Sequence, residues 1–451
     1  MDSSAEICIN DYVAWALSDI ERGQLAELHN ALKELHPSEV AALLEAMPPE
    51  QRTVLWEAVP EAQGSEVLTY LHDEARASII GEMADAELVA AAERMDVEDL
   101  AEVIEELPQD LSDTILEALE KDHRARLEAV LAYEEGTAGR LMSTEVLSVR
   151  PGASLAVVLR WLRRHERLPA HTDALMVIDG EGVYQGKLPM EIIVTGDPEA
   201  KVQDVMQPDA EVVRATASEH DVANLFDRRD LVSVAVLDEN DQLLGRITVD
   251  DVIDIIREEA DRVLLQSAGL DEEEDLFAPV LPSAQRRGVW LGINLVTVFL
   301  AAWVIGQFEE ALSKIVALAV LMPVVASMGG IAGSQTLTLT IRGMALDQIA
   351  DANVRWLTVK ELAVGALNGV VWALVVAVVA FFWFNDPGLS AVIASAMVLN
   401  LVAAALAGVA VPLALRRMGI DPALSGAVIL TTVTDVIGFL SFLGLASVFL
   451  L

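Results

Sequence analysis

Residues 422–451 read PALSGAVILTTVTDVIGFLSFLGLASVFLL, and Asp435 is the only ionisable side chain among these thirty residues. A run of about 20 apolar residues is long enough to cross a bilayer as a helix. A carboxylate inside such a run is costly, because neither lipid nor a protein core solvates its charge. The stretch therefore predicts a membrane helix whose single acidic group belongs to an ion or proton path.

Four further apolar stretches of similar length precede this one. The five predicted spans cover roughly 288–307, 313–341, 356–383, 388–414 and 423–450. Basic residues cluster before the first span, between the second and third, and between the fourth and fifth: Arg286, Arg287, Arg342, Arg355, Lys360, Arg416 and Arg417. Basic loops stay in the cytosol, so we expect a multi-pass protein of the plasma (cell inner) membrane with a cytosolic N-terminus and an external C-terminus. The alternative is five core helices of a large soluble protein.

Charge divides the chain into two different halves. The 451 residues carry a formal net charge of −40. From Gly288 onward, 8 acidic and 6 basic residues leave a net charge of −2, so the first 287 residues carry −38. Such an acidic half repels nucleic-acid phosphates, which excludes nucleic acid as a partner, and it attracts cations, divalent ones most. Adaptation of the surface to high salt is an alternative explanation of the acidity.

Residues 1–135 predict an acidic domain built from helices. Short apolar-periodic stretches are separated by breakers near every twelfth residue, and VAALLEAMP at 40–48 matches LAEVIEELP at 100–108 at an offset of 60. Repeated helical units of this kind stack into a superhelix, because each unit buries its apolar face on its neighbours. We expect the outer face of this superhelix to be strongly acidic.

A second repeat occupies 136–258. The stretch LMVIDGEGVYQGKLPMEII matches VAVLDENDQLLGRITVDDVID further along the chain, and in each copy an Asp precedes a Gly by seven residues (Asp179 and Gly186, Asp238 and Gly245). Each copy predicts a helix, then two strands joined by a turn, then a helix that opens with acidic residues. The pattern resembles a tandem pair of CBS domains, an α/β module that binds adenosine nucleotides such as ATP, or ions, and signals to an attached domain.

The second copy closes with TVDDVIDIIREEADR, which crowds carboxylates onto one helix. Like charges on a shared helix face destabilise the helix, so counter-charges or metal ions are expected to bind there. The candidates for a regulatory metal site are Asp250, Asp251, Asp254, Glu258 and Glu259. A solvated acidic face is the alternative. A connecting helix over 259–286 then leads to a membrane domain over 287–451.

The second span contains LMPVVASMGGIAGSQ, in which Pro323 removes a helix hydrogen bond and three glycines permit unusual backbone conformations. Irregular backbone at membrane depth occurs only where protein or a water-filled path covers it, so we expect a break beside a pore; a seam of small packing residues is the alternative. Polar residues in the other spans are pore candidates too, although each alone suits an interhelical hydrogen bond. The candidate pore-lining residues are Thr431, Thr432, Gly329, Gly330, Asn368 and Asn400.

The order of these parts resembles the MgtE family of magnesium channels. EEGTAGRLMSTE, TVDDVIDII, PVVASMGGIAGSQ and DPALSGAVILTTVTDVIGF carry the resemblance, which covers nearly the whole chain. It implies a homodimer in the lipid bilayer with its pore on the two-fold axis, walled by the second and fifth spans, and Asp435 matches the family's pore carboxylate. It also implies that the connecting helix acts as a plug, held shut when cytosolic Mg²⁺ bridges the acidic N-terminal and CBS domains. Ile331 and Ala427 depart from the family pattern at the inner mouth, where many members have asparagine.

The expected function is therefore Mg²⁺ transport through a gated channel, with Mg²⁺ as both cargo and regulator. One alternative is a transporter of broader specificity that also carries Co²⁺, Mn²⁺ or Ni²⁺, although no cluster of soft ligands lies near Asp435 in the sequence. A CBS-regulated membrane enzyme is another alternative, but a metalloprotease motif needs histidines on a span, and the predicted spans contain none. A chloride-type channel with CBS domains would not be expected to carry a lone carboxylate in its path. We expect no enzymatic activity.

Overall fold

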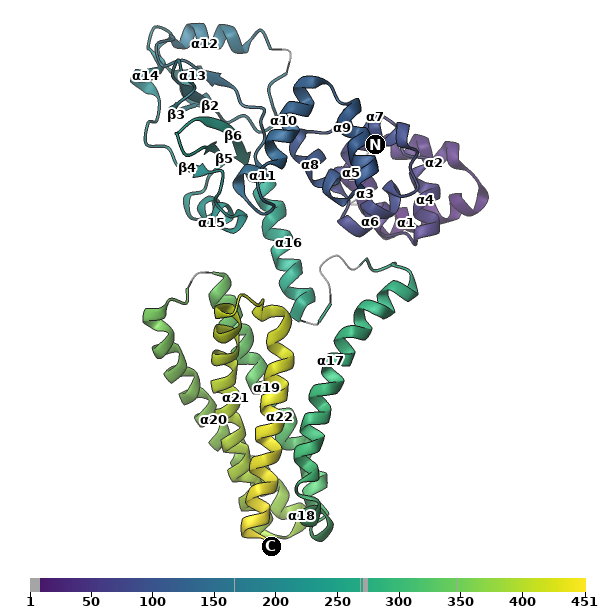
Figure 1. Ribbon diagram of the computed structural model, residues 1–451, viewed down its shortest axis with the longest axis vertical. Helices are drawn as coiled ribbons and strands as arrows, with labels where there is room; N and C mark the ends of the chain where they lie inside the picture. The colour runs from purple at the N-terminus through teal and green to yellow at the C-terminus, as the bar shows by residue number, and fades with distance from the viewer. Residues whose placement is uncertain (1–8, 166, 268, 271–274, 347) are drawn as a thin grey trace, which may run out of the picture. The chain divides into compact units, whose positions relative to one another are not determined.

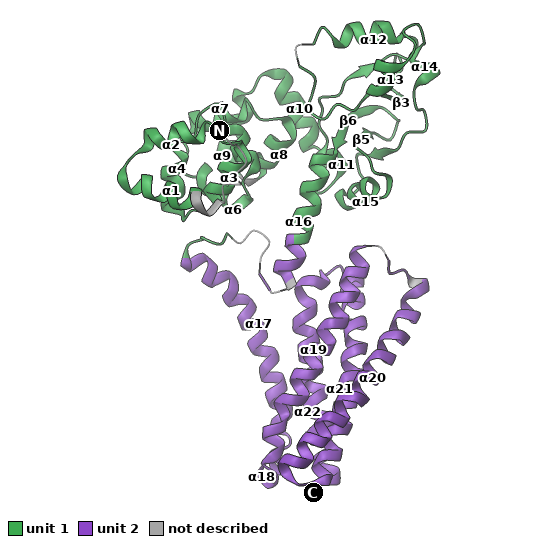
Figure 2. Ribbon diagram, turned by 180° about the vertical axis from the view of Figure 1, so that it is seen from behind, with its two compact units in different colours: residues 1–260, 273–279 green, residues 261–272, 280–451 purple. Residues whose placement is uncertain are grey.

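A computed structural model describes residues 9–165, 167–267, 269–270, 275–346 and 348–451 of the chain. The chain divides into two compact units, which Figure 2 colours separately. The first unit comprises residues 1–260 and 273–279, and the second comprises residues 261–272 and 280–451. Each unit is described below by itself.

The first part of the first unit contains helices only, as the repeat predicts. The helices are α1 (Ile9–Arg22), α2 (Leu25–Leu32), α3 (Pro37–Glu45), α4 (Pro49–Trp56), α5 (Gly64–Tyr70), α6 (Asp73–Ile80), α7 (Asp85–Ala92), α8 (Val97–Glu106), α9 (Gln109–Ala118) and α10 (Lys121–Leu131). Prolines separate some of these helices: Pro37 and Pro49 begin α3 and α4. At the first helical position the backbone N–H makes no helix hydrogen bond, so its absence in proline does not weaken the helix. Val40 and Leu100, equivalent positions of the repeat, are fully buried in one core.

Two small sheets follow, and Figure 1 shows each beside its own helices. Their elements are α11 (Ala138–Leu141), β1 (Ser148–Val149), α12 (Leu155–Leu162), β2 (Ala174–Ile178), β3 (Tyr184–Pro189), α13 (Met190–Thr195), α14 (Val202–Val205), β4 (Val212–Arg214), α15 (Glu219–Arg229), β5 (Ser233–Leu237), β6 (Leu243–Thr248) and α16 (Val249–Ser267). The orders are β1-β2-β3 and β4-β5-β6, each with one parallel and one antiparallel pair. The hairpins were predicted, whereas β1 and β4 were missed because they are two and three residues long.

The Asp–Gly pairs of the repeat shape the hairpin turns. The Asp179 carboxylate accepts hydrogen bonds from the backbone N–H groups of Glu181 and Val183, and Asp238 does the same for Asn240 and Gln242. These are the local side-chain-to-backbone bonds that make aspartate a turn residue. The repeated Asp–Gly spacing in the sequence therefore corresponds to the same hairpin turn in each of the two sheets.

The connecting helix differs from the prediction of 259–286. Helix α16 is continuous from Val249 to Ser267, since no glycine or proline interrupts that stretch. Gly269 follows it with a positive φ of 73°, a conformation that favours glycine and is typical just after a helix end. A new helix, α17, begins only at Val280, after Pro279. Within the predicted stretch, residues 268 and 271–274 lie outside the described residues.

The second unit consists of long apolar helices, which Figure 1 shows running side by side. They are α17 (Val280–Gly306), α19 (Ala317–Ala345), α20 (Asp351–Phe384), α21 (Pro387–Arg417) and α22 (Pro422–Phe449), with the short α18 (Glu309–Lys314) between the first two. Five helices in the described part of the chain are long and apolar enough to cross a membrane. This confirms the predicted fold class: an all-α domain, an α/β CBS pair and five membrane helices.

The prediction of a break in the second span is wrong. Helix α19 runs without interruption through Pro323 and the glycines. Pro323 lies inside α19, at its seventh residue, so it removes one helix hydrogen bond without ending the helix. The glycines serve close packing: a Cβ on Gly333 would meet Leu430 at 3.0 Å, and one on Gly329 would lie 2.2 Å from Asn400. The alternative of a small-residue seam therefore describes α19 better than irregular backbone.

Candidate functional site

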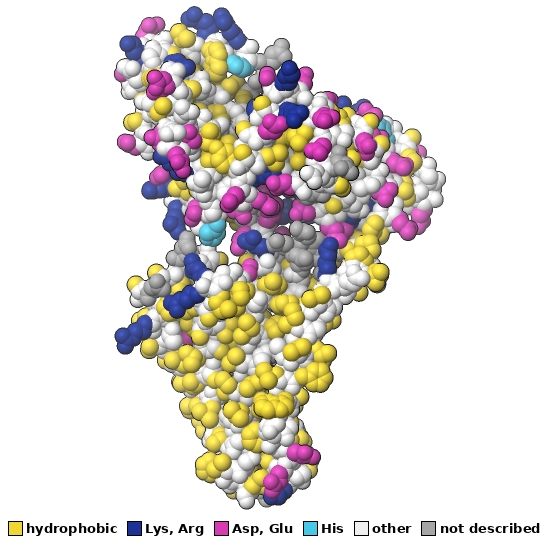
Figure 3. Space-filling model, in the orientation of Figure 1, with side chains coloured by type: hydrophobic (Ala, Val, Ile, Leu, Met, Phe, Trp, Pro, Cys, Tyr) yellow, Lys and Arg dark blue, Asp and Glu magenta, His cyan; other side chains and the backbone are white. Residues whose placement is uncertain are grey.

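Inside the first unit, acidic side chains of two helices lie close enough for the charge of one to raise the pKa of another. Helix α8 carries Glu98, Asp99 and Glu102, and helix α16 carries Asp254 and Glu258. Figure 3 shows Asp and Glu side chains gathered on the surface of this unit, and hydrophobic side chains covering the second unit. We call the five carboxylates of α8 and α16 named above the acidic interface.

Burial and mutual repulsion raise the pKa of several of these groups. Burial, followed by the charges of neighbouring carboxylates, raises the pKa of Asp99 to about 8. Burial acts first on Glu258 also, with Glu102, Asp73 and Asp254 adding repulsion, and its pKa rises to about 7. Burial likewise raises the pKa of Glu98 to about 7. Carboxylates with pKa values this far above the ordinary range favour a proton or a cation beside them.

Basic side chains neutralise only part of this charge. Arg76 is buried and pairs with Asp73 at 2.6 Å and with Glu102 at 2.5 Å. Thr69 donates its hydroxyl hydrogen to Asp99 over 3.3 Å. Among the described residues, no three acidic, histidine or cysteine side chains stand close enough together to form a ready metal site.

The five regulatory candidates do not all have the same position. Asp251 accepts from the backbone N–H of Thr248 at 2.9 Å, and Asp250 accepts from the Thr248 hydroxyl at 2.5 Å, so both hold the start of α16. Asp250 also lies 3.3 Å from Nε2 of His171. Asp254, Glu258 and Glu259 instead lie further along α16, beyond its first turn.

Sequence reasoning missed the partners on α8. Glu98, Asp99 and Glu102 were visible as an acidic stripe beside the apolar positions of VEDLAEVIEE. The charge pattern predicts an exposed acidic face there, but it carries no information that this face meets α16. That juxtaposition depends on the packing of α8 and α11 against one another across a long sequence separation, for example through Arg140, whose Nη2 donates to the Ala101 carbonyl at 2.7 Å.

In the second unit, Asp435 lies on α22 and is half-exposed. The neighbouring threonines do not bond to it: Thr431 donates to the Ala427 carbonyl at 2.8 Å, and Thr432 donates to the Val428 carbonyl at 2.7 Å. No hydrogen bond or ion pair within the described part of the chain reaches the Asp435 carboxylate. By contrast Glu361, a buried carboxylate of α20, has Lys360 at 2.5 Å and the Thr336 hydroxyl at 3.2 Å.

Asn400 makes the interhelical hydrogen bond that was the alternative to a pore-lining position. Its side chain is fully buried where α19, α21 and α22 meet, and its amide donates to the Val325 carbonyl at 2.8 Å. Gly329 and Gly438 leave the space that this side chain fills, since a Cβ on either would lie within 2.8 Å of its amide nitrogen. Asn400 therefore joins the helices one turn beyond Asp435 and offers no surface to a pore.

The other pore-lining candidates are scattered. Gly329 is buried against Asn400, whereas Gly330 has open space around it. Thr431 is exposed and Thr432 half-buried on the helix of Asp435. Asn368 is exposed on α20. The structure thus brings Thr431, Thr432 and Asp435 together on one helix and does not gather the remaining candidates around them.

The raised pKa values predict how stability depends on pH. The carboxylates of the unfolded chain titrate near pH ~4, whereas Glu98, Asp99 and Glu258 do so at about 7 to 8 when folded. The folded chain therefore binds more protons in that window, and its free energy of unfolding falls as pH rises from about 5 to about 8. Thermal unfolding of the first unit, followed in the full chain without divalent cations, measures this slope. Glu98→Gln with Asp99→Asn should flatten it; a midpoint that rises over the window would contradict the assignment.

Both halves of the chain match known protein families. Residues 322–445 match the family model MgtE, described as a divalent cation transporter, residues 35–136 match the MgtE intracellular N domain, and residues 202–258 match the CBS domain. The magnesium transporter MgtE of Thermus thermophilus is 31% identical over 96% of this chain and 97% of its own length. That of Bacillus subtilis is 26% identical over 95% of each chain.

One solved structure is similar to about half of the chain. A crystal structure of the cytosolic domain of the Mg²⁺ channel MgtE in complex with ATP matches 54% of this chain and 99% of that one, with 30% sequence identity and a TM-score of 0.49. Identity at this level along the whole length of the Thermus thermophilus protein, together with the helical domain, the CBS pair and the five apolar helices, shows that this chain belongs to the MgtE family of multi-pass membrane transporters.

Proposed function

We propose that this protein is a Mg²⁺ channel whose pore carboxylate is Asp435 and whose opening is controlled by Mg²⁺ at the acidic interface. The observation that carries the proposal is the half-exposed Asp435 carboxylate, which has no partner in the described part of an otherwise apolar helix. A charge in this position is retained only where an ion or water compensates it. The family adds support, because its curated relatives are named magnesium transporters.

The chemistry of Mg²⁺ suits one carboxylate per chain. Mg²⁺ gives up its water shell reluctantly and usually keeps several waters while one or two carboxylates hold it. In a homodimer with a two-fold axis along the pore, two Asp435 side chains would face each other and supply that pair. The exposed position of Thr431 and Asp435 on α22 supports an interface there, since residues of a shared pore must lie on the surface of each chain.

The orientation follows from charge. We infer that the loops with the basic clusters at Arg342, Arg355 and Lys360 and at Arg416 and Arg417 face the cytosol, because basic loops are retained there. The first unit would then lie in the cytosol, where it could sense the Mg²⁺ concentration, and the C-terminus would lie outside the cell inner membrane.

Gating follows from the acidic interface. Mg²⁺ bound between α8 and α16 would offset the repulsion among Asp99, Glu102, Asp254 and Glu258, and so stabilise the closed approach of the two helices. Helix α16 continues past residue 260, where the first compact unit ends. Rising cytosolic Mg²⁺ would thereby close the channel. An adenosine nucleotide at the CBS pair is a further regulatory ligand on the strength of the CBS match alone.

The transported ion can be tested directly. The dimer, its mass first checked by light scattering, is reconstituted into liposomes that contain an ion-sensitive dye. We expect uptake of Mg²⁺ to exceed that of Ca²⁺, because a site built on hydrated coordination favours the smaller ion's tightly held shell. Equal uptake of Mg²⁺, Mn²⁺, Co²⁺ and Ni²⁺ would favour the broader transporter, and no ion flux would end the channel proposal.

The sensor is tested with Asp254→Asn combined with Glu258→Gln. Removing these two charges from the acidic interface should raise the Mg²⁺ concentration that half-closes the channel by about tenfold, which corresponds to ~1.4 kcal/mol. The matched control is Asp113→Asn with Glu117→Gln, which removes two exposed charges at the same spacing from α9. An equal shift in both variants would attribute the effect to net charge and refute a specific sensor.

A further inference from the structure

A buried arginine in the helical domain holds the chain shortly before the first membrane helix. Arg52 of α4 is 1% exposed, and its Nε and Nη2 donate to the carbonyls of Leu44 and Met47 at 3.1 Å and 3.2 Å. The Leu44 carbonyl belongs to the last turn of α3, and the Met47 carbonyl lies in the turn between α3 and α4. The guanidinium therefore has a structural role inside the domain and one further direction in which to donate.

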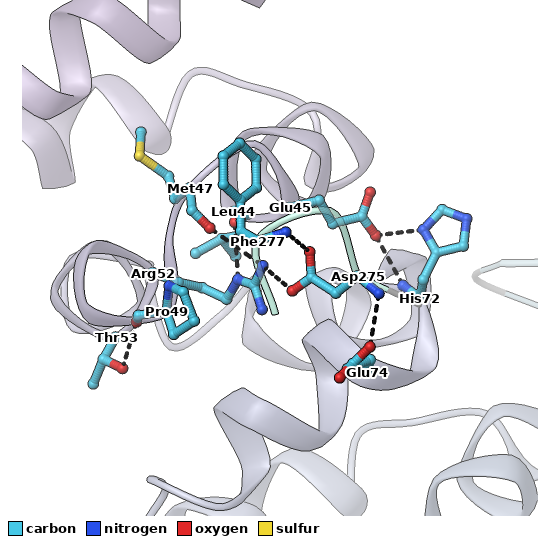
Figure 4. A network of polar contacts seen from close by, with 10 residues as sticks. All are labelled: Leu44, Glu45, Met47, Pro49, Arg52, Thr53, His72, Glu74, Asp275 and Phe277. Carbon is cyan, nitrogen blue, oxygen red and sulfur yellow. Dashed lines mark hydrogen bonds and ion pairs between the residues drawn. The ribbon is translucent and has the colours of Figure 1, made fainter. Parts of the chain in front are cut away.

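That direction is occupied by Asp275, as Figure 4 shows. Nη2 of Arg52 lies 2.6 Å from one oxygen of the Asp275 carboxylate, whose side chain is 9% exposed. The other oxygen accepts the backbone N–H of Phe277 at 2.9 Å, and the backbone N–H of Asp275 donates to Glu74 of α6 at 2.7 Å. Two helices of the domain thus hold one short segment through both its side chain and its backbone.

The position of this segment in the chain makes the contact informative. Residues 273–279 group with the first unit, although the residues before and after them, 261–272 and 280–451, group with the second. Helix α17, the first membrane span, begins at Val280. The segment that directly precedes α17 in the sequence therefore contacts the helical domain.

We propose that the Arg52 pocket is a docking site for the segment Asp275–Phe277 and that this contact couples the helical domain to α17. The coupling is separate from the path through the CBS pair and α16. A buried ion pair of this kind is sensitive to the loss of one partner, because the remaining charge stays buried without compensation. Docking would let the position of the helical domain bias the first span directly. This step rests on the proposed Mg²⁺-controlled gating.

The test uses Asp275→Ala in the full-length protein. This variant leaves Arg52 bonded to Leu44 and Met47, so the helical domain keeps its internal contacts. The control is Glu128→Ala, which also removes one negative charge from an arginine pair, here the exposed pair with Arg124 on α10. Hydrogen exchange measures docking, through the amide of Phe277, and liposome flux measures the Mg²⁺ concentration for half-closure.

We expect Asp275→Ala to accelerate exchange at Phe277 and to raise the half-closing Mg²⁺ concentration about fivefold or more, the lower range of typical allosteric coupling. Stabilisation of the first unit by Mg²⁺ should stay as in the wild type, because the acidic interface is intact. Glu128→Ala should change none of these quantities.

The outcomes separate the two proposals. Unchanged exchange at Phe277 would show that the segment is not docked and would overturn the inference. Faster exchange with an unchanged half-closing concentration would show docking without coupling and would overturn it as well. Loss of Mg²⁺ closure in the wild type would instead refute the gating proposal. Arg52→Lys, which keeps the charge but not the fork of donors, should reproduce the Asp275→Ala shift if it folds; wild-type gating in a folded Arg52→Lys protein would contradict the docking site.

Discussion

The cost of removing a carboxylate from water is the constraint on which this structure depends. A charge that leaves water must find a partner, lose its ionisation or attract an ion. The protein shows all three responses. Glu361 and Asp275 have basic partners, the acids at the acidic interface have raised pKa values, and Asp435 meets no protein partner among the described residues.

These responses explain why one ion can serve both units. In the proposed function, carboxylates that lie close to one another attract a hydrated divalent cation, both at the acidic interface and at a two-fold pair of Asp435 side chains. Binding at the interface would change the packing of helices, whereas binding on the axis would compensate a charge within apolar helices. The same ion can then act as regulator and as cargo without a shared site.

Much of the fold could be predicted because it depends on local patterns. Apolar length predicted the five spans, and repeats predicted the helical superhelix and the two hairpins. Asp435 was visible as a lone charge. The features that escaped prediction depend on groups that are close in space but far apart in the sequence: the acids of α8 near those of α16, and Arg52 against Asp275. For Asn400 the sequence left a pore position and an interhelical hydrogen bond open, and the structure shows the hydrogen bond. Pro323 misled the prediction because α19 continues through it although the proline removes one helix hydrogen bond.

The most direct measurement is Mg²⁺ flux through Asp435→Asn, with Ser441→Ala of the same helix as the control. Asparagine keeps the size of the side chain and removes the charge, and Coulomb attraction of a divalent ion is worth several kcal/mol where water is scarce. The account predicts that flux in liposomes falls by about 100-fold or more, equivalent to ~2.7 kcal/mol, while dimer mass and thermal midpoint stay at or above the wild-type values. Flux near wild type in a well-folded Asp435→Asn protein would show that Asp435 is a structural residue and would contradict the account.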